Sequence, residues 1–245
     1  MIYLTCKLLI IMNNLLVYNT KDNYQLSLII AMFYNKQCMI TDNNLLCLYL
    51  NEYIKDKIIN KIKNNIPLYN KIHTDLNKIL YNSGYYEDNI LDLHNFFFDK
   101  FNITHVALLI DDVIKSVKYI SVNIPEHTYV INLSSLIYDK IGILTNTPDI
   151  ITIYLGVHPN VSINIQKRMA FTGQKRYLVN YIWYFYSVIC YSPKTLKYYV
   201  IFIYHNEYYI FDADNIPCIY KADMTDVHLV ERIKRESVLI YYRKN

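Results

Sequence analysis

Glycine is scarce in this sequence, with 4 glycines in 245 residues and no glycine-rich loop. A loop that closely approaches a phosphate group or a substrate backbone usually needs glycine, so the scarcity excludes the glycine-rich phosphate-binding loops. Long apolar runs are missing as well, because none reaches the roughly 20 residues that a membrane-spanning helix needs. The apolar start "MIYLTCKLLIIM" has Lys7 within the run and lacks a small-residue cleavage site. We therefore expect a soluble, cytoplasmic protein with no membrane span.

Paired cysteines are also missing. The number of cysteines is odd and no CxxC pair occurs, which excludes a disulfide framework and a structural zinc site. The 5 cysteines are Cys6, Cys38, Cys47, Cys190 and Cys218. The histidines form no HxxxH or HxH pair, and the adjacent Asp111 and Asp112 have no further ligand at metal-site spacing. We expect no metal and no cofactor.

Charge of one sign does not dominate. The 25 lysines and arginines exceed the 21 acidic residues and give a net charge of +4, but the basic residues are scattered. We therefore do not expect a nucleic-acid partner. The sequence is rich in Ile, Asn, Lys and Tyr, including 27 tyrosines, and these residues have A/T-rich codons. This skew indicates an A/T-rich genome, such as that of a large DNA virus, for example a poxvirus, or that of an A/T-rich parasite. A viral origin would place the protein in the host cytoplasm or the virion.

The first hundred residues carry helical patterns. Apolar residues recur at helical spacing from about Tyr24 to Tyr34, in "NEYIKDKIINKIKNN" with its solvated lysine face, in "HTDLNKIL" and in "NILDLHNFFFDKF". From Thr104 onward, β-branched and aromatic runs replace them. These runs are "HTYVINLSSLIY", "DIITIYLGV", "NVSINIQ", "RYLVNYIWYFYSVICY", "KYYVIFIYHNEYYIFDAD" and "ESVLIYYRK". We predict an α+β protein whose antiparallel strands include a hairpin around His205, Asn206 and Glu207.

Four collinear stretches resemble the catalytic core of the ubiquitin-specific proteases (USPs), a family of papain-like cysteine hydrolases. The stretch "NTKDNYQLSLIIAMFY" is similar to the family's nucleophile box from Tyr24 through Ser27 to Met32. "LDLHNFFFDKF" resembles the second box, and "PDIITIYLGV" resembles a strand that begins with a proline. The strongest match comes last, where "YYVIFI", "EYYIFDAD" and "SVLIYYRK" are similar to the family's closing strands in the same order.

The resemblance implies a single USP-like domain over residues 1–245. In such a papain-like fold, a helical thumb over about residues 19–102 packs on an antiparallel β palm over about residues 103–245. The zinc-binding CxxC pairs of the family's fingers are absent. The fingers would therefore be reduced to the part of the chain between Ile103 and Pro148.

The resemblance also implies which residues occupy the catalytic positions. Asn23 falls at the nucleophilic cysteine, Tyr198 at the general-base histidine and Asp212 at the orienting acid. The family's oxyanion asparagine precedes the nucleophile by five residues, but here Tyr18 stands there and Asn19 is displaced by one place. The amide of an asparagine has no ionisable proton near neutral pH, and a phenol with a pKa near 10 is poorly matched to proton transfer. We therefore expect no intact triad.

The leading interpretation is a catalytically inactive USP-like protein that binds ubiquitin or a viral or host protein, or that forms a structural part of a viral assembly. A first alternative is an active cysteine deubiquitinase or protease with a relocated nucleophile, namely Cys190, Cys38 or Cys47, with His205 near Asp212 in the sequence. For these cysteines, core packing is the more ordinary role. A second alternative is a basic nucleic-acid-associated protein, which rests on the net charge of +4.

Overall fold

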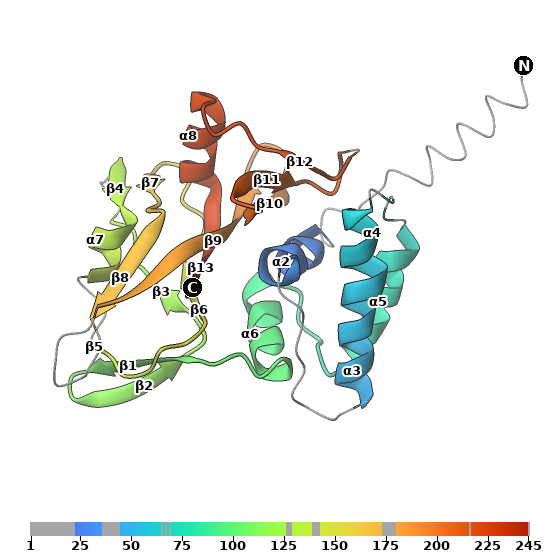
Figure 1. The fold of residues 1–245 in the computed structure, drawn as a ribbon, viewed down its shortest axis with the longest axis horizontal. Coiled ribbons are helices and arrows are strands. Elements are labelled where there is room, and N and C mark those ends of the chain that lie inside the picture. Colours follow the sequence, from blue (N-terminus) through green and yellow to red (C-terminus); the bar gives the residue numbers. More distant parts are fainter. Residues whose placement is uncertain are drawn as a thin grey trace, which may run out of the picture. The chain divides into compact units, whose positions relative to one another are not determined.

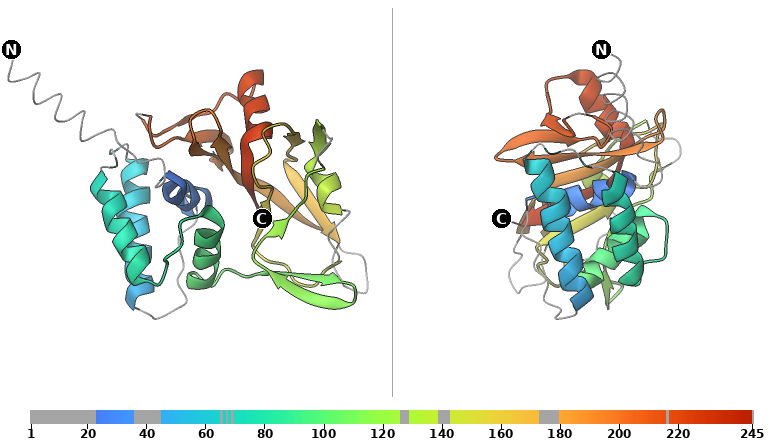
Figure 2. Two further views of the ribbon diagram at one scale, coloured as in Figure 1. Left: turned by 180° about the vertical axis from the view of Figure 1, so that it is seen from behind. Right: turned by 90° about the vertical axis from the view of Figure 1, so that its right-hand side faces the viewer.

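The computed structural model describes residues 23–35, 45–64, 66, 68, 70–125, 129–138, 143–172, 180–215 and 217–244. The chain divides into two compact units. The helical unit comprises Met1–Asn102 and Ile210–Tyr220, and the β unit comprises Ile103–Tyr209 and Lys221–Asn245. Figures 1 and 2 show the helices of the first unit and the sheet of the second.

Six helical segments make up the described N-terminal part of the helical unit. They are α2 (Asn23–Phe33), α3 (Leu45–Glu52), η1 (Tyr53–Ile59), α4 (Asn60–Lys63), α5 (Asn70–Asn82) and α6 (Ile90–Lys100). The segments α3, η1 and α4 follow one another without a break, and α5 packs beside them (Figures 1 and 2). The helices predicted from the apolar spacing are confirmed in this part of the chain.

Helix α2 is buried along almost its whole length and packs on α6 and η1 within the helical unit. Every residue from Tyr24 to Tyr34 is buried. The ring of Phe33 contacts the ring of Phe97 in α6, at a centroid distance of 5.5 Å, and the ring of Phe101, the C-cap of α6, at 4.8 Å. A helix that is apolar on all sides is stable only when other elements enclose it. The apolar run that follows Gln25 therefore has a packing role along its whole length.

The helix predicted from "NEYIKDKIINKIKNN" is present, but its middle is not α-helical. Ile54, Ile58 and Ile62 are buried, as their four-residue spacing predicts. Tyr53–Ile59 form a π-helix, and the backbone N–H of the next residue, Asn60, donates to the carbonyl of Lys55, five residues earlier. Periodicity did not predict this segment, because an apolar spacing of four fits both helix types. Single π-turns are rare and are often found at functional sites.

Helix α5 ends in a Schellman motif that requires glycine. The N–H of Gly84 donates to the carbonyl of Tyr81 at 3.0 Å, and the N–H of Tyr85 donates to that of Leu80 at 2.9 Å. Gly84 has a φ of +93°, in the region that residues with a Cβ seldom adopt. No atom lies within 4 Å of the position that a Cβ would take, so the backbone conformation alone selects glycine here.

The β unit contains most of a large mixed sheet. In the order β12-β11-β10-β9-β13-β6-β3, neighbouring strands are hydrogen-bonded, and β8 also pairs with β9. Their bounds are β3 Ile120–Ser121, β6 Ile150–Tyr154, β8 Arg168–Thr172, β9 Asn180–Ser192, β10 Lys197–Tyr204, β11 Glu207–Phe211, β12 Ile219–Lys221 and β13 Ser237–Lys244. Two smaller sheets contain β1 (Val106–Ile110), β2 (Val113–Val117) and β5 (Ile143–Leu144), and β4 (Val130–Asn132) with β7 (Ser162–Asn164).

The β unit is organised around strands β9 and β13, which pair antiparallel. Trp183, Tyr241 and Tyr242 on these strands are fully buried. Their polar atoms are partly satisfied by backbone carbonyls, because Trp183 Nε1 donates to Pro148 at 2.8 Å and the Tyr242 hydroxyl donates to Gln166 at 2.8 Å. A strand that is covered on both faces has a near-continuous apolar sequence, which explains the pattern "SVLIYY".

The predicted hairpin between β10 and β11 is confirmed. His205 and Asn206 form its two-residue turn and both have positive φ values, 48° and 63°, as a type I′ turn demands. Asp111 and Asp112, with φ values of 50° and 60°, form the same kind of turn between β1 and β2. Asp111 and Asp112 therefore occupy turn positions, which Asp commonly takes.

Three details correct the expectation of an antiparallel β half. Part of "HTYVINLSSLIY" folds as helix α7 (Leu133–Tyr138), because only Val130–Asn132 finds a strand partner. A second helix, α8 (Val227–Glu236), is capped by the Asp226 carboxylate, which accepts from the N–H of His228. The pairs β3–β6 and β4–β7 are parallel. Among the described helices, none has the length and apolar character to cross a bilayer.

Replacing Gly84 by alanine should lower the free energy of unfolding by about 1–2 kcal/mol, because an L-residue with a Cβ is strained at this φ. Urea denaturation followed by circular dichroism measures the change. Lys78→Ala, at an exposed position of the same helix, is the matched control and should have a small effect. Equal stabilities of the native protein and Gly84→Ala would contradict the assigned cap.

The buried His73 of α5 should make stability depend on pH. Burial lowers the pKa of His73 to about 4 from its ordinary value of 6.5. Between these two values the unfolded chain binds more protons at His73 than the folded chain does. The contribution of the neutral His73 to the free energy of unfolding is therefore fully present above pH 6.5 and is lost as the pH falls toward 4. We expect a loss of about 3 kcal/mol over this window that is absent in His73→Phe. Parallel pH profiles for the two proteins in urea denaturation would show that other groups are responsible.

Candidate functional site

The residues that the sequence assigns to the catalytic positions are distributed over both units. Asn23 is the first residue of α2, and Asp212 directly follows β11, so both belong to the helical unit. Tyr198 is the second residue of β10 in the β unit. Asn19 lies outside the described residues. The grouping of Asn23, Tyr198 and Asp212 into one site therefore stays a prediction from the motifs.

Helix α2 is held firmly just after Asn23. The hydroxyl of Tyr24 lies 3.3 Å from the hydroxyl of Tyr85 and donates to Asp88 Oδ1 at 3.3 Å. Gln25 Nε2 donates to Asn77 Oδ1 at 2.7 Å. The N-terminus of a helix favours a thiolate, because its free N–H groups and dipole lower a thiol pKa. At this helix start the sequence supplies an amide, which gains no nucleophilic character there.

The carboxylate of Asp212 stabilises its own turn. Oδ1 accepts from the backbone N–H of Asp214 at 3.2 Å, and Oδ2 accepts from Asn215 Nδ2 at 3.0 Å. The backbone N–H of Asp212 donates to the carbonyl of Cys218 at 2.9 Å, which closes the loop between β11 and β12. This arrangement gives Asp212 a structural role that needs no histidine.

Tyr198 takes part in a cross-strand aromatic pair. It lies opposite Tyr191 of β9, and the two ring centroids are 5.0 Å apart. Such pairs stabilise antiparallel strands. The half-buried Tyr198 ring is therefore accounted for by packing on the sheet.

Cys190, the foremost candidate for a relocated nucleophile, is enclosed at the centre of the sheet. It is fully buried on β9, opposite Tyr199 of β10 and Ser237 of β13. Burial raises the pKa of the Cys190 thiol well above its ordinary value. A nucleophilic cysteine needs the opposite, a lowered pKa and access for the substrate.

A charged group covers this thiol from helix α8. The Tyr199 hydroxyl donates to Glu236 Oε2 at 2.7 Å and accepts from Arg232 Nε at 3.2 Å. The Arg232 guanidinium also lies 4.7 Å from the centroid of the Tyr199 ring. This network fixes α8 on the sheet and contains no imidazole.

The other candidates are equally unsuited to a thiol mechanism or cannot be placed. Cys218 is half-buried, and burial together with the Asp212 carboxylate raises its pKa. His205 is an exposed turn residue whose ring packs on Tyr204 at a centroid distance of 4.0 Å. Cys38 lies outside the described residues, as does the side chain of Cys47. Within the described part of the chain, no group of three His, Cys, Asp or Glu side chains is arranged to hold a metal ion.

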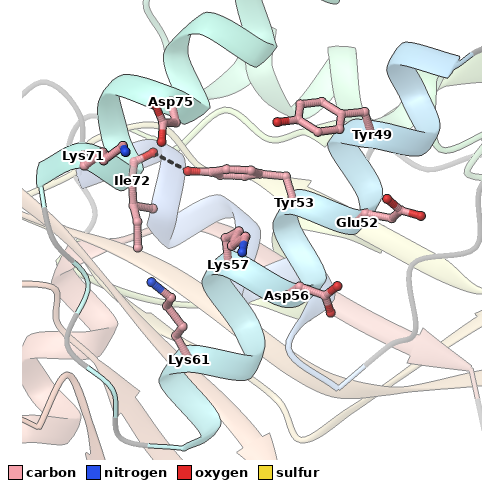
Figure 3. Close-up of a pocket in the computed structure, with 9 residues that line it drawn as sticks. All are labelled: Tyr49, Glu52, Tyr53, Asp56, Lys57, Lys61, Lys71, Ile72 and Asp75. Carbon is pink, nitrogen blue, oxygen red and sulfur yellow. Dashed lines mark hydrogen bonds between the residues drawn. The ribbon is translucent and has the colours of Figure 1, made fainter.

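A cavity that the sequence interpretation missed lies on the outer helices of the helical unit (Figure 3). Its volume is about 430 Å³. It is lined by Tyr49, Glu52, Tyr53, Asp56, Lys57, Lys61, Lys71, Ile72 and Asp75. The sequence pattern predicts a solvated face for the lysines of this segment. The local sign of a cavity in the sequence is that tyrosines and lysines recur at every fourth residue.

Comparison with known proteins identifies similar solved structures. No protein-family model and no curated protein matches the sequence. A structure of the Ubp8-Sgf11-Sgf73-Sus1 SAGA DUB module matches with a TM-score of 0.56 and 8% identity, covering 95% of this chain and 67% of the matched chain. A second structure of the SAGA DUB module, with a substituted Ubp8, matches with a TM-score of 0.57 and 8% identity, covering 92% of this chain and 63% of that chain.

These matches concern the fold alone, because the sequence identity is 8%. The chain spans about two thirds of the length of the chains that it matches, 63% and 67%. Its helices and mixed sheet resemble those of a deubiquitinase module, and the fold is distantly USP-like. The family resemblance that the motifs predict is confirmed to this extent.

Proposed function

We propose that this protein is a catalytically inactive member of the USP-like fold that acts by binding another protein. The observation that carries the proposal is the residue at the start of α2. The motif resemblance assigns Asn23, the first residue of α2, to the family's nucleophile position, where covalent catalysis requires a thiol. In this proposal, the helical unit corresponds to the thumb, the β unit to the palm, and residues 103–148 to reduced fingers.

The state of the described cysteines supports inactivity. Cys190 is fully buried, and burial raises the pKa of both Cys190 and Cys218. A thiol that stays protonated and enclosed cannot attack a peptide or isopeptide carbonyl at neutral pH. The first alternative, an active hydrolase whose nucleophile is Cys190, Cys38 or Cys47, would need either the release of Cys190 from its surroundings or a reactive thiol at Cys38 or Cys47.

The residues at the remaining catalytic positions support the same proposal through their contacts. Tyr198 pairs with Tyr191 across two strands, and the Asp212 oxygens accept hydrogen bonds from residues of their own turn. Each group therefore has a packing or turn-forming role in place of proton transfer. We infer that these residues serve the fold, which is what a binding protein requires of them.

The partner is proposed to be a protein. The similar structures are multi-protein DUB modules, which makes protein binding a natural use of this fold. Ubiquitin and a viral or host protein are the two candidate partners, and a structural part in a viral assembly, in the host cytoplasm or the virion, is the third possibility.

Thiol alkylation tests the enclosed state of Cys190. In the native protein, iodoacetamide should leave Cys190 unmodified, whereas the half-buried Cys218 should react slowly. Both should react fully in urea, and peptide mass spectrometry separates the two sites. Modification of Cys190 at similar rates with and without urea would revive the alternative of a relocated nucleophile.

A ubiquitin with a thiol-reactive C-terminal group tests the assigned catalytic position. We expect no adduct with the native protein. Asn23→Cys should form an adduct if the ubiquitin tail still reaches the start of α2, because the helix N-terminus favours the thiolate. Asn64→Cys, at an exposed position after α4, is the matched control and should remain unmodified.

Titration with labelled ubiquitin separates the binding roles. Saturable binding of ubiquitin by the native protein supports ubiquitin as the partner. No binding at millimolar ubiquitin, together with an unmodified Asn23→Cys, leaves the other protein partners or the assembly role. An adduct of the native protein at Cys190, Cys38 or Cys47 would overturn the inactive assignment.

A further inference from the structure

The cavity on the helical unit has an ordered lining. Tyr49, Tyr53, Lys57 and Lys61 follow one another at four-residue intervals along α3, η1 and α4, so they lie on one stripe of the helical segment. The stripe begins with two aromatic rings and ends with two ammonium groups. The cavity therefore has an aromatic end and a cationic end.

Helix α5 supplies the opposite wall. Lys71, Ile72 and Asp75 line the cavity from this helix. In Figure 3, the side chains of Lys61 and Lys71 point toward Ile72 from the two sides. A third lysine is thus added to the cationic end, and the apolar Ile72 side chain forms the floor between them.

The aromatic end is fixed in place. The Tyr53 hydroxyl donates to the carbonyl of Ile72 at 3.1 Å, which ties η1 to α5. Burial, with the nearby Asp75 carboxylate, raises the pKa of Tyr53 to about 12, so the ring remains a neutral phenol. The Tyr49 ring is 55% exposed and its centroid lies 6.5 Å from that of Tyr53. A planar ligand group can therefore reach an open aromatic face beside a rigid one.

The three lysines share the cavity with three acidic residues, Glu52, Asp56 and Asp75. No ion pair or side-chain hydrogen bond joins Lys57, Lys61 or Lys71 to another residue in the described part of the chain. The two acidic residues of the neighbouring stripe, Glu52 and Asp56, point away from the lysines in Figure 3. Asp75 lines the same cavity but forms no ion pair with these lysines in the described part of the chain. Three ammonium groups that are not held in ion pairs favour an anion, and a phosphate is a group that lysines commonly bind.

The backbone at this site is also unusual. The π-helix Tyr53–Ile59 carries Tyr53 and Lys57, and the α-helical geometry resumes at Asn60. Such segments are often retained where side chains must be directed to a ligand. The cavity volume of about 430 Å³ falls within the range of small-molecule sites, roughly 300–1,000 Å³.

We propose that this cavity binds a small phosphorylated molecule with a planar ring, of the nucleotide class. The phosphates contact Lys57, Lys61 and Lys71, and the ring packs against Tyr49 and Tyr53. Asp75, beside the aromatic end, accepts a hydrogen bond from an exocyclic amine of the base. The site is separate from the catalytic positions and does not depend on the proposed inactive function.

Isothermal titration calorimetry with ADP at low ionic strength tests the site. We expect saturable 1:1 binding that weakens as salt is added. The double variant Lys57→Gln/Lys61→Gln should raise the Kd for ADP about tenfold or more, because two charge-assisted contacts are lost. Lys55→Gln/Lys78→Gln removes the same charge from exposed positions of η1 and α5 outside the cavity lining and should change the Kd less than about twofold.

The aromatic end is tested separately. Tyr49→Ala should weaken ADP binding several-fold and leave the binding of pyrophosphate unchanged, because only the base contacts the ring. Tyr49 is half exposed, so the variant should fold normally, which circular dichroism verifies.

Three results would overturn the proposal. These are a lack of saturable ADP binding up to millimolar concentration, an equal loss of affinity in the two double-lysine variants, and tighter binding of a single-stranded oligonucleotide than of ADP. The last result would assign this surface to nucleic acid, with the steep salt dependence that phosphate-backbone contacts produce.

Discussion

The pairing of β9 with β13 is the contact on which the sheet depends. In the sheet order, β13 lies between β9 and β6, so it joins the long strands β9 and β10 to the short strands β6 and β3. Strands β9 and β13 come from distant parts of the sequence, Asn180–Ser192 and Ser237–Lys244. Non-local pairs of this kind form late and slowly, because the intervening chain must be ordered first. The fully buried side chains of Trp183 and Tyr241 stabilise the pairing, because it removes their apolar surface from water.

The residues near the proposed catalytic positions are used for structure. Cys190 is enclosed by the Tyr199, Glu236 and Arg232 network, which attaches helix α8 to the sheet. The network lies at the edge of the core, because Glu236 is mostly buried while Arg232 is half exposed. The thiol beneath it is fully buried and gains no freedom to react. Under the proposed function, these contacts hold together the interior of a β unit whose surface another protein recognises.

Much of the fold could be predicted because local patterns dominate it. The buried α2 follows from an apolar run at helical spacing, and the hairpin at His205 and Asn206 follows from two aromatic strands around a polar turn. Helix α8 was missed although Asp226 and the basic last turn, Lys234 and Arg235, are ordinary helix signals. The surrounding β pattern outweighed them. The parallel pairs depend on which distant strand is available, and local sequence does not encode that choice.

The candidate sites differ in what the sequence could provide. The family motifs identify Asn23, Tyr198 and Asp212 one at a time. A short motif does not say how far apart residues of different motifs lie in the folded chain. The nucleotide-type cavity was missed because half of its wall comes from α5, and the packing of α5 on η1 is non-local. The four-residue recurrence of tyrosine and lysine is the one local sign of that site.

The π-helix has a consequence for how this segment can change in length. A π-turn holds one residue more than an α-turn, so the deletion of one residue within Tyr53–Ile59 can be absorbed by a return to α-helical geometry. The helical segments on either side would keep their orientation about the axis, and the side chain of Ile62 would stay in the core. The same deletion in the middle of α5, which is α-helical throughout, would turn everything after it by about 100°.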